Sequence, residues 1–385
     1  MAVIDPRRMS RSRGRTAWQS PGHDLTTRQI LTRRSLLAGG ASLGAAAALP
    51  GGLAGGPAQA AATPAVPFGG AIQIEFIDKD PAYGPAFLDH CDLIMPQNEL
   101  KFSMMRWTRE EFTFEPADRL VEYALSHGKT SRGHCFVWWG ATPEWLKAIN
   151  DPAEVEAELL GHIHTVASRY RGKLQSWDVV NEVIANDPLT EGPLRDTHFM
   201  RTMGPRHIPL AFKATAEAHP EAMLVLNDYD LEYVGDRCDA RRKVALQLVR
   251  QLQDNNIDIG AVGMQGHLYA ELKIDVEGVG RFAEELKSLG VGLIISELDI
   301  IDRHIKGGAE EQDAAAMRSV SDLLDAVLPT NRPKAVITWG ITDRYSWVPD
   351  VMPRTDGNPD RPLPLDRNYM PKGWYEMLRR RLAAA

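Results

Sequence analysis

The sequence predicts an α/β protein built as a single (β/α)8 barrel, the TIM-barrel fold. From residue 71 onward, eight short apolar runs rich in β-forming residues alternate with longer stretches whose apolar residues recur every three or four positions. Polar and ionisable residues gather where these runs end. Strand–helix alternation over about 300 residues is typical of a closed parallel barrel, and such barrels carry their sites at the carboxyl ends of the strands.

The predicted elements follow in order along the chain. The strands are expected at residues 71–76, 93–98, 130–138, 176–182, 223–228, 261–267, 292–300 and 335–342. The clearest helices are expected at 116–128 and 153–170, where apolar residues fall on one face. No internal repeat and no linker rich in Pro or Ser divides residues 61–385, so we predict one domain there.

Residues 1–60 differ in kind from the rest of the chain. Arg33 and Arg34 precede a mildly apolar run of Leu, Ala and Gly that ends in Ala58-Gln59-Ala60. This layout predicts a twin-arginine export signal that is removed after Ala60, and hence a periplasmic or secreted protein. A membrane anchor is the alternative, but Gly and Pro interrupt the run and its hydropathy is weak for a bilayer span.

Composition narrows the class of protein. The chain has 385 residues, of which 44% are hydrophobic and 25% charged, as in globular proteins rather than disordered ones. A net charge of −7 argues against a nucleic-acid partner. Cys91, Cys135 and Cys238 lack metal-ligand spacing and are expected to be buried thiols rather than disulfides. We predict no cofactor, no metal and no stable membrane anchor, and expect a monomer.

Two glutamates at strand ends carry the chemical prediction. Glu182 ends the fourth predicted strand and Glu297 lies near the end of the seventh, so both are expected at the mouth of the barrel. Asn181 precedes the first glutamate, and Asp299 follows the second on the same strand face. Cleavage of a glycosidic bond requires one protonated and one ionised carboxyl group on either side of the bond. The pair therefore predicts a glycosidase.

Several motifs occur in an order typical of one enzyme family. They are "RGHCFVWW", "TPEWL", "WDVVNE", "LVLNDY", "GMQGHL", "ISELDI" and "TWGITDRYSW". Together they resemble glycoside hydrolase family 10, the retaining endo-β-1,4-xylanases, over roughly residues 68–380. The resemblance implies that Glu182 is the acid/base and Glu297 the nucleophile of a double displacement that cleaves β-1,4-xylosidic bonds in xylan or xylo-oligosaccharides.

The resemblance also implies the supporting residues. His267 would hydrogen-bond Glu297 and be held by Asp299, although a core histidine is the alternative; Asn181 and Gln265 would contact hydroxyl groups around the cleaved sugar. The side chains expected to bind the glycone are Asn98, Lys101, His134, Trp138, Trp339 and Trp347. Trp145 and Trp177 are as well explained by the core.

Three positions depart from the family pattern. Gln97 stands where the family usually has Glu, and Trp139 and Ala141 stand where it commonly has His and Gln. We place all three on the glycone side, where the exchanges remove hydrogen-bonding capacity and add an indole. We therefore expect bond cleavage to be retained while glycone recognition has drifted.

Other functions stay open at this point. The same mechanism could act on a different β-linked plant glycan or glycoconjugate, and a barrel that has lost its chemistry could only bind carbohydrate. A metal-dependent hydrolase would need ligands such as His134, Asp228, His267 and Asp299, but the first strand lacks an H-x-H pair. The Pro-rich loop at 343–365 could shape the cleft, and endo against exo cleavage is undecided.

Overall fold

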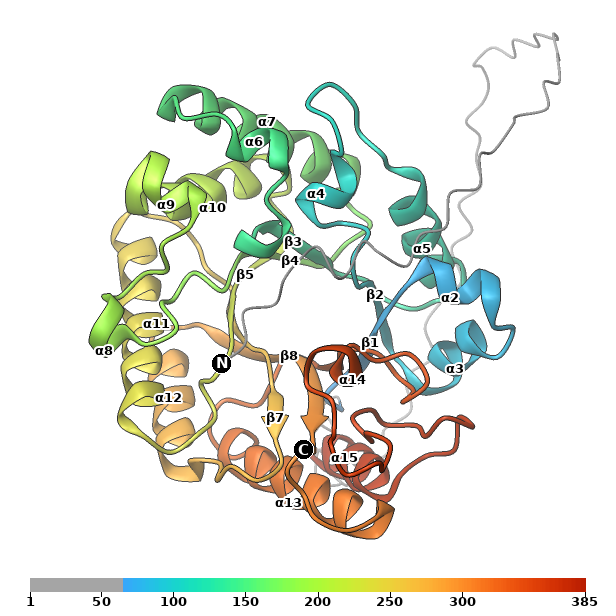
Figure 1. Ribbon diagram of the computed structural model, residues 1–385. Helices are drawn as coiled ribbons and strands as arrows, with labels where there is room; N and C mark the ends of the chain where they lie inside the picture. Colours follow the sequence, from blue (N-terminus) through green and yellow to red (C-terminus); the bar gives the residue numbers. More distant parts are fainter. Residues whose placement is uncertain (1–64) are drawn as a thin grey trace, which may run out of the picture. The chain divides into compact units, whose positions relative to one another are not determined.

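Eight parallel strands curve around a common axis in the computed structural model, which describes residues 65–385 (Figure 1). These strands are β1 Phe68–Ile72, β2 Leu93–Pro96, β3 Gly133–Val137, β4 Ser176–Asn181, β5 Met223–Asp228, β6 Ala261–Met264, β8 Gly292–Ile301 and β9 Val336–Thr338. They pair in the order β2-β1-β9-β8-β6-β5-β4-β3. A single bridge between Leu93 and Thr130 joins the two ends of this sheet. The predicted barrel fold is confirmed, with a weak seam between β2 and β3.

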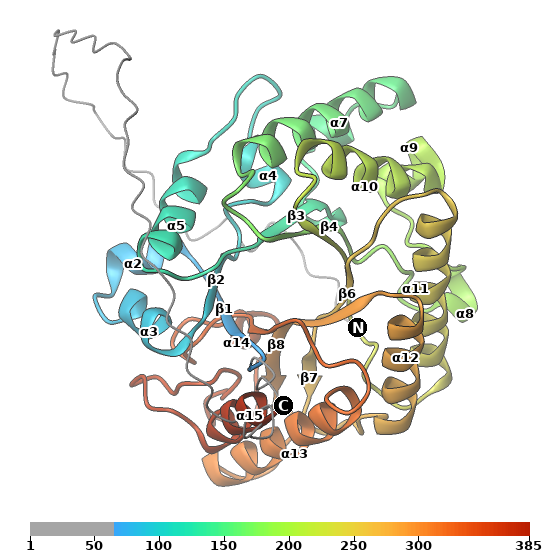
Figure 2. The same cartoon turned by 180° about the vertical axis from the view of Figure 1, so that it is seen from behind.

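Helices surround the strands, as the front and rear views show (Figures 1 and 2). They are α2 Ile74–Lys79, α3 Tyr83–His90, α4 Phe102–Met105, α5 Glu115–Ser126, α6 Glu144–Lys147, α7 Pro152–Arg169, α8 Pro188–Glu191, α9 His198–Met203, α10 His207–Ala218, α11 Asp236–Asp254, α12 Val276–Ser288, α13 Ala309–Val327, α14 Val348–Val351 and α15 Gly373–Ala384. The helices expected at 116–128 and 153–170 correspond to α5 and α7.

Helix α7 shows how local signals build this outer layer. Asp151 caps its start by accepting a 3.1 Å hydrogen bond from the amide of Ala153, and Pro152 occupies the first turn. Val155, Leu159 and Ile163 are buried at a spacing of four residues. Each buried side chain of this size contributes about 1.5–3 kcal/mol relative to exposure, which fixes the face that meets the barrel.

The prediction for the first strand is wrong at its carboxyl end. Residues 71–76 were expected to be extended, but β1 stops at Ile72 and α2 begins at Ile74. The amide of Ile74 donates to the buried carboxylate of Glu99, 3.0 Å away, rather than to a neighbouring strand. A partner 25 residues along the chain therefore turns the backbone, which local apolar patterning does not reveal.

A short extra strand, β7 (His267–Tyr269), pairs with β8 outside the main ladder. Its register sets His267 opposite Asp299. The sequence predicts a single strand over residues 261–267. Gly266 interrupts it with a φ of 77°, a conformation that glycine adopts without strain. The break lets β6 stay in the barrel while β7 directs His267 to the mouth.

A second cluster of buried side chains lies on or next to β1, β2, β5, β6, β8 and β9 and fills the barrel interior. Its buried members are Ala71, Leu93, Met95, Val225, Ala261, Ile294, Ala335, Ile337 and Trp339. This cluster closes the barrel below the strand ends. The three cysteines are buried and free, as expected.

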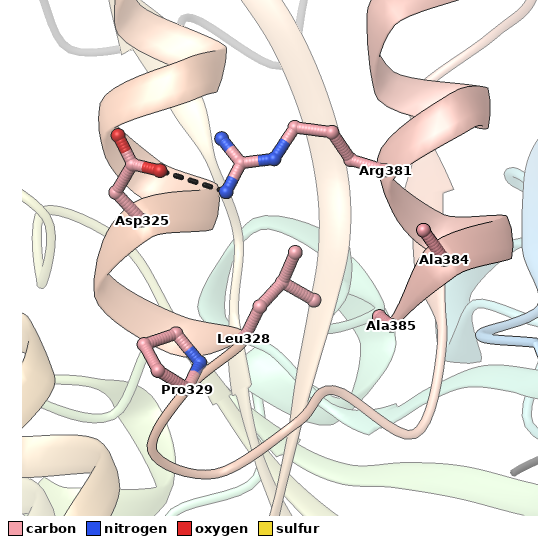
Figure 3. A pocket seen from close by; sticks show the side chains of 6 residues that line it. All are labelled: Asp325, Leu328, Pro329, Arg381, Ala384 and Ala385. Carbon is pink, nitrogen blue, oxygen red and sulfur yellow. Dashed lines mark hydrogen bonds and ion pairs between the residues drawn. The ribbon is translucent and has the colours of Figure 1, made fainter.

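Two further observations bear on the surroundings of the barrel. Among residues 65–385, no helix combines the length and the apolar character that a membrane crossing requires. Figure 3 shows a surface hollow lined by Asp325, Leu328, Pro329, Arg381, Ala384 and Ala385. It lies where α13 ends, next to the amino ends of the strands and so opposite the face of the glutamates. The predicted export signal, residues 1–60, lies outside the described residues.

Candidate active site

Glu182 lies in a strained turn directly after β4. Its φ of 55° is unusual for a residue other than glycine, and such a conformation costs about 1–3 kcal/mol. The neighbouring strand holds the turn: the amide of Glu182 donates to the carbonyl of Asn227 at 2.9 Å, and the amide of Ile184 donates to Asp228 at 3.0 Å. The end of β5 thus fixes where the Glu182 side chain leaves the barrel.

Glu297 projects from β8 into a buried, hydrogen-bonded position and is only 4% exposed. Its Oε1 accepts a 2.6 Å hydrogen bond from Asn227 Nδ2, and its Oε2 lies 3.3 Å from Nε2 of His267. Burial raises the pKa of the Glu297 carboxyl, but the hydrogen bond from His267 and the fields of His134 and His267 lower it further than burial raises it. The net pKa lies below the ordinary value, so Glu297 is ionised at neutral pH.

His267 stands between two carboxylates. Its Nδ1 is 2.8 Å from Asp299 Oδ1, and the other oxygen of Asp299 accepts a 2.6 Å hydrogen bond from Trp347 Nε1. Burial lowers the pKa of His267, but Asp299 and Glu297 raise it well above its ordinary value. An imidazolium therefore holds Glu297 in its charged form, as the expected role of His267 and Asp299 requires.

Asn227, to which the sequence pattern assigns no role, connects the two glutamates. Its Nδ2 donates to Asn181 Oδ1 at 2.8 Å as well as to Glu297, and its Oδ1 accepts a 2.5 Å bond from Ser296. Gly263 makes room for it, because a Cβ at that position would lie 2.1 Å from Asn227 Oδ1. The signal available in the sequence was an amide at the buried end of β5, the strand next to β4.

Gln265 and Asn181 extend this network to Glu182. The Gln265 Nε2 lies 3.2 Å from Asn181 Oδ1 and 3.4 Å from Glu182 Oε1, the latter a long hydrogen bond. Both bonds to Asn181 use its oxygen, which leaves its amide nitrogen for other partners. The structure thus brings the four predicted residues Asn181, Glu182, Gln265 and Glu297 together.

Trp139 makes a contact that the sequence did not predict. It begins a turn of 3-10 helix, Trp139–Ala141, and its Nε1 donates a 2.7 Å hydrogen bond to Glu182 Oε2. We had placed this residue with the glycone-binding side chains. The indole instead reaches across 43 positions of the chain to the predicted acid/base.

The residues expected to grip the glycone form a second group. Lys101 Nζ donates to Asn98 Oδ1 at 2.8 Å and lies 4.8 Å and 5.5 Å from the ring centroids of Trp138 and Trp339. Burial lowers the pKa of Lys101, and the field of Glu297 opposes this shift. Trp339 is buried, whereas Trp138 and Trp347 are half-buried.

An amide pair lies beside this group and replaces the missing carboxylate. Gln97 Oε1 accepts a 3.1 Å hydrogen bond from Gln73 Nε2, and Gln73 Oε1 accepts a 3.0 Å bond from Asn98. The sequence pattern predicts Gln73 within a strand and gives it no role. Its position became relevant only because the chain turns directly after it, at the start of α2.

His134 is held in place by Asp178, which in turn pairs with Arg132; the sequence pattern predicts neither contact. Its Nδ1 is 2.9 Å from Asp178 Oδ2, and Arg132 forms an ion pair with the other oxygen of that aspartate. Burial raises the pKa of Asp178, but Arg132 and His134 lower it below the ordinary value. His134 lies 4.0 Å from Glu297 and packs edge-on against Trp339.

Several predicted candidates lie apart from this cluster. Asp228 forms an ion pair with Arg241 of α11, and among residues 65–385 no group of three or more His, Cys, Asp and Glu side chains is arranged to hold a metal ion. Trp177 is fully buried in the core, and Trp145 is partly buried against it.

Comparison with known proteins identifies the family. The profile of glycosyl hydrolase family 10 matches residues 58–381. The chain is 32% identical over 280 residues to endo-1,4-beta-xylanase 2 of Claviceps purpurea, covering 72% of this chain and 76% of that protein. It is 30% identical over 300 residues to endo-1,4-beta-xylanase B of Thermotoga neapolitana, covering 75% and 80%. The structure resembles xylanase 10B from Thermotoga petrophila RKU-1 in complex with xylobiose, with a TM-score of 0.73, 27% identity and coverage of 82% and 94%. This chain belongs to glycosyl hydrolase family 10.

Proposed function

We propose that the protein is a retaining endo-1,4-β-xylanase with Glu182 as acid/base and Glu297 as nucleophile. The observation that carries the proposal is the contrast between the two carboxyl groups. Glu297 is buried and held ionised by His267, whereas Glu182 lies in a more open turn with a neutral donor, Trp139, on its carboxyl group. Double displacement at an acetal carbon needs this division of roles.

In the first step, Glu297 attacks the anomeric carbon while Glu182 gives its proton to the leaving oxygen. The bond from sugar to leaving oxygen breaks as the bond from sugar to Glu297 forms. In the second step, Glu182 takes a proton from water, whose oxygen displaces Glu297 and yields a sugar with the original configuration. Asn227 and His267 stabilise Glu297 each time it regains its full negative charge.

The experiment compares the purified protein with Glu182→Gln and Glu297→Gln on xylan and linear xylo-oligosaccharides. The parent should release oligosaccharides whose reducing ends appear first as the β-anomer by proton NMR. Both variants should lose at least about 100-fold in kcat, because each removes a group essential to the chemistry. Initial formation of the α-anomer would exclude the double displacement. Binding without cleavage by the parent would favour the carbohydrate-binding alternative.

The contacts on the glycone side support a more specific proposal. We propose that the enzyme binds an unsubstituted xylose, two units upstream of the cleaved bond, more weakly than is usual in the family, or that it prefers a decorated glycan. The neutral pair of Gln73 and Gln97 takes the place of a carboxylate that would accept stronger hydrogen bonds from sugar hydroxyls. Trp139 contacts Glu182, so restoring all three departures at once would mix two effects. Gln97→Glu alone should raise kcat/KM on linear xylo-oligosaccharides; an unchanged value would count against the proposal.

We further propose that residues 1–60 direct twin-arginine export and that residues 61–385 form the mature catalytic domain, acting as a monomer on its polysaccharide. The twin arginines and the small residues before Ala61 support this. Replacing both Arg33 and Arg34 by Lys should abolish export while the enzyme accumulates in active form inside the cell. Export of this variant at the parent's level would refute the assignment.

A further inference from the structure

We propose that Trp139, braced by Arg195, is a positioning residue that holds the acid/base Glu182 in place for proton transfer. The inference rests on the proposed function and adds a residue to its machinery. It starts from one hydrogen bond, 2.7 Å from Trp139 Nε1 to Glu182 Oε2. The only other side-chain hydrogen bond to this carboxyl group within residues 65–385 is the 3.4 Å contact from Gln265 to Oε1. The indole is therefore the stronger restraint.

The indole of Trp139 can act only as a hydrogen-bond donor to Glu182. An indole N–H can donate but cannot accept, so Oε2 must be an acceptor whether Glu182 is ionised or protonated. Gln265 Nε2 donates the longer bond, 3.4 Å, to the other oxygen, Oε1. Because indole does not titrate, this donor is present in both steps of the reaction.

Arg195 ties this indole to the backbone of the same glutamate. Its Nε donates a 2.9 Å hydrogen bond to the carbonyl of Glu182, and its guanidinium lies 5.3 Å from the ring centroid of Trp139. A further bond joins Arg195 to the hydroxyl of Tyr229, which donates in turn to Asn186 at 3.3 Å. One cation therefore restrains both the strained turn at Glu182 and the donor that binds its side chain.

Arg195 lies at the end of a loop, residues 183–195, that begins directly after Glu182 and folds back toward it. The amide of Arg195 donates to the carbonyl of Val183 at 2.8 Å, and Ile184 bridges to Leu194. The loop at residues 183–195 is therefore pinned together at its two ends, at the carboxyl end of β4. Its closure sets Arg195 over Trp139 independently of substrate.

Two substrates with the same glycone but different leaving groups distinguish the positioning of Glu182 from a general effect on the stability of the protein. Proton transfer matters for a poor leaving group such as a sugar and hardly matters for dinitrophenolate. We therefore measure kcat/KM for a xylo-oligosaccharide and for the matching dinitrophenyl β-glycoside. Trp139→Phe keeps an aromatic ring but loses the donor, whereas Trp139→His keeps a ring donor. Trp145→Phe is the control, because it loses an indole hydrogen bond to the carbonyl of Arg106 at 3.1 Å, outside the network that joins the two glutamates.

Trp139→Phe should lower kcat/KM on the oligosaccharide by about 10- to 100-fold and on the dinitrophenyl glycoside by less than about 3-fold. Trp139→His should recover part of the loss, and Trp145→Phe should leave the ratio of the two values unchanged. Arg195→Met should shift the ratio in the same direction, and its effect should not add to that of Trp139→Phe.

Equal losses on both substrates, or no loss on either, would overturn the proposal. The test applies to any glycone that the parent hydrolyses. Failure of the parent on xylo-oligosaccharides alone would count against the proposed substrate, while the ratio measured on another glycone would still decide the role of Trp139. Circular dichroism melts of each variant identify a loss that comes from unfolding.

Discussion

Asn227 Nδ2 lies 2.6 Å from Oε1 of Glu297, while the carbonyl oxygen of the same Asn227 accepts the amide of Glu182 at 2.9 Å. The side chain of one residue thus holds the predicted nucleophile, and its backbone holds the strand end that carries the predicted acid/base. The relative position of the two glutamates is therefore coupled to the end of β5.

Asn227→Ala should lower kcat strongly with little change in KM. The variant removes the charge-assisted hydrogen bond to Oε1 of Glu297 and leaves the carboxylate held by His267 at Oε2, which we expect to cost about 10- to 100-fold in kcat. Steady-state kinetics on xylo-oligosaccharides measure the effect. Ser296→Ala is the matched control, because it removes only the bond that orients Asn227, and its effect should be smaller. A larger loss for Ser296→Ala would show that Asn227 is not the main restraint.

Gly263→Ala should impair activity through Asn227. A Cβ at residue 263 would lie 2.1 Å from Asn227 Oδ1, so the amide must move away from Glu297. We expect a fall in kcat and a loss of about 1–3 kcal/mol in the free energy of unfolding, as for other overpacked sites.

Gly260→Ala is the control for that substitution. Its Cβ would lie 2.4 Å from Cγ of Met223, a flexible side chain at the opposite end of the strands. Thermal melts and kinetics together should show a stability cost for both variants and a loss of kcat for Gly263→Ala alone. Equal kcat values would contradict the steric argument.

His267→Asn should move the acidic limb of the kcat/KM profile to higher pH. The imidazolium of His267 helps to hold the pKa of Glu297 below its ordinary value, so removing the cation makes Glu297 easier to protonate. Activity in acid should therefore fall at a higher pH than in the parent. An acidic limb that stays in place would mean that Asn227 and His134 suffice to keep Glu297 ionised.

The same histidine should affect stability with a defined sign. Its pKa is raised well above 6.5 in the folded protein, so folding favours the protonated ring. The resulting stability is fully present below about pH 6.5 and declines as the pH rises through the folded-state pKa. Urea unfolding of the parent and His267→Asn should therefore differ more at pH 6 than at high alkaline pH. A difference that grows with pH would have the wrong sign.

His162 should make the protein sensitive to acid. It is fully buried in α7, its ring stacks 3.7 Å from that of Phe102, and neither ring nitrogen has a hydrogen-bond partner among residues 65–385. Burial, with the nearby charge of Arg106, lowers its pKa well below 6.5. As the pH falls below about 6.5, the unfolded chain takes up a proton that the folded protein does not, so stability decreases.

His162→Leu should reduce that loss of stability. The melting temperature of the variant should fall less than that of the parent between pH 7.5 and pH 5. His164→Leu on the same helix is the control, since that side chain is 46% exposed. An identical pH dependence in the parent and His162→Leu would refute the assignment.

Sequence patterns predicted the alternation of strands and helices and placed Asn181, Glu182, Glu297 and Asp299 at or near the ends of strands. These features are local, because alternation and helical spacing report which side of each segment is buried. The order of the motifs also predicted the family correctly. The turn after Ile72 and the break at Gly266 were missed, because a distant hydrogen bond and a single backbone conformation decide them.

The contacts that hold the site together could not be predicted from the sequence, because they form between segments that are distant along the chain. The bonds from Trp139 to Glu182 and from Asn227 to Glu297 join residues 43 and 70 positions apart. The register of β7 on β8 likewise places His267 beside Asp299. Such contacts depend on the order in which strands close into a barrel and on the room that Gly263 leaves for an amide. A pattern of local burial carries no information about which side chains meet across the barrel, because that depends on closure and packing.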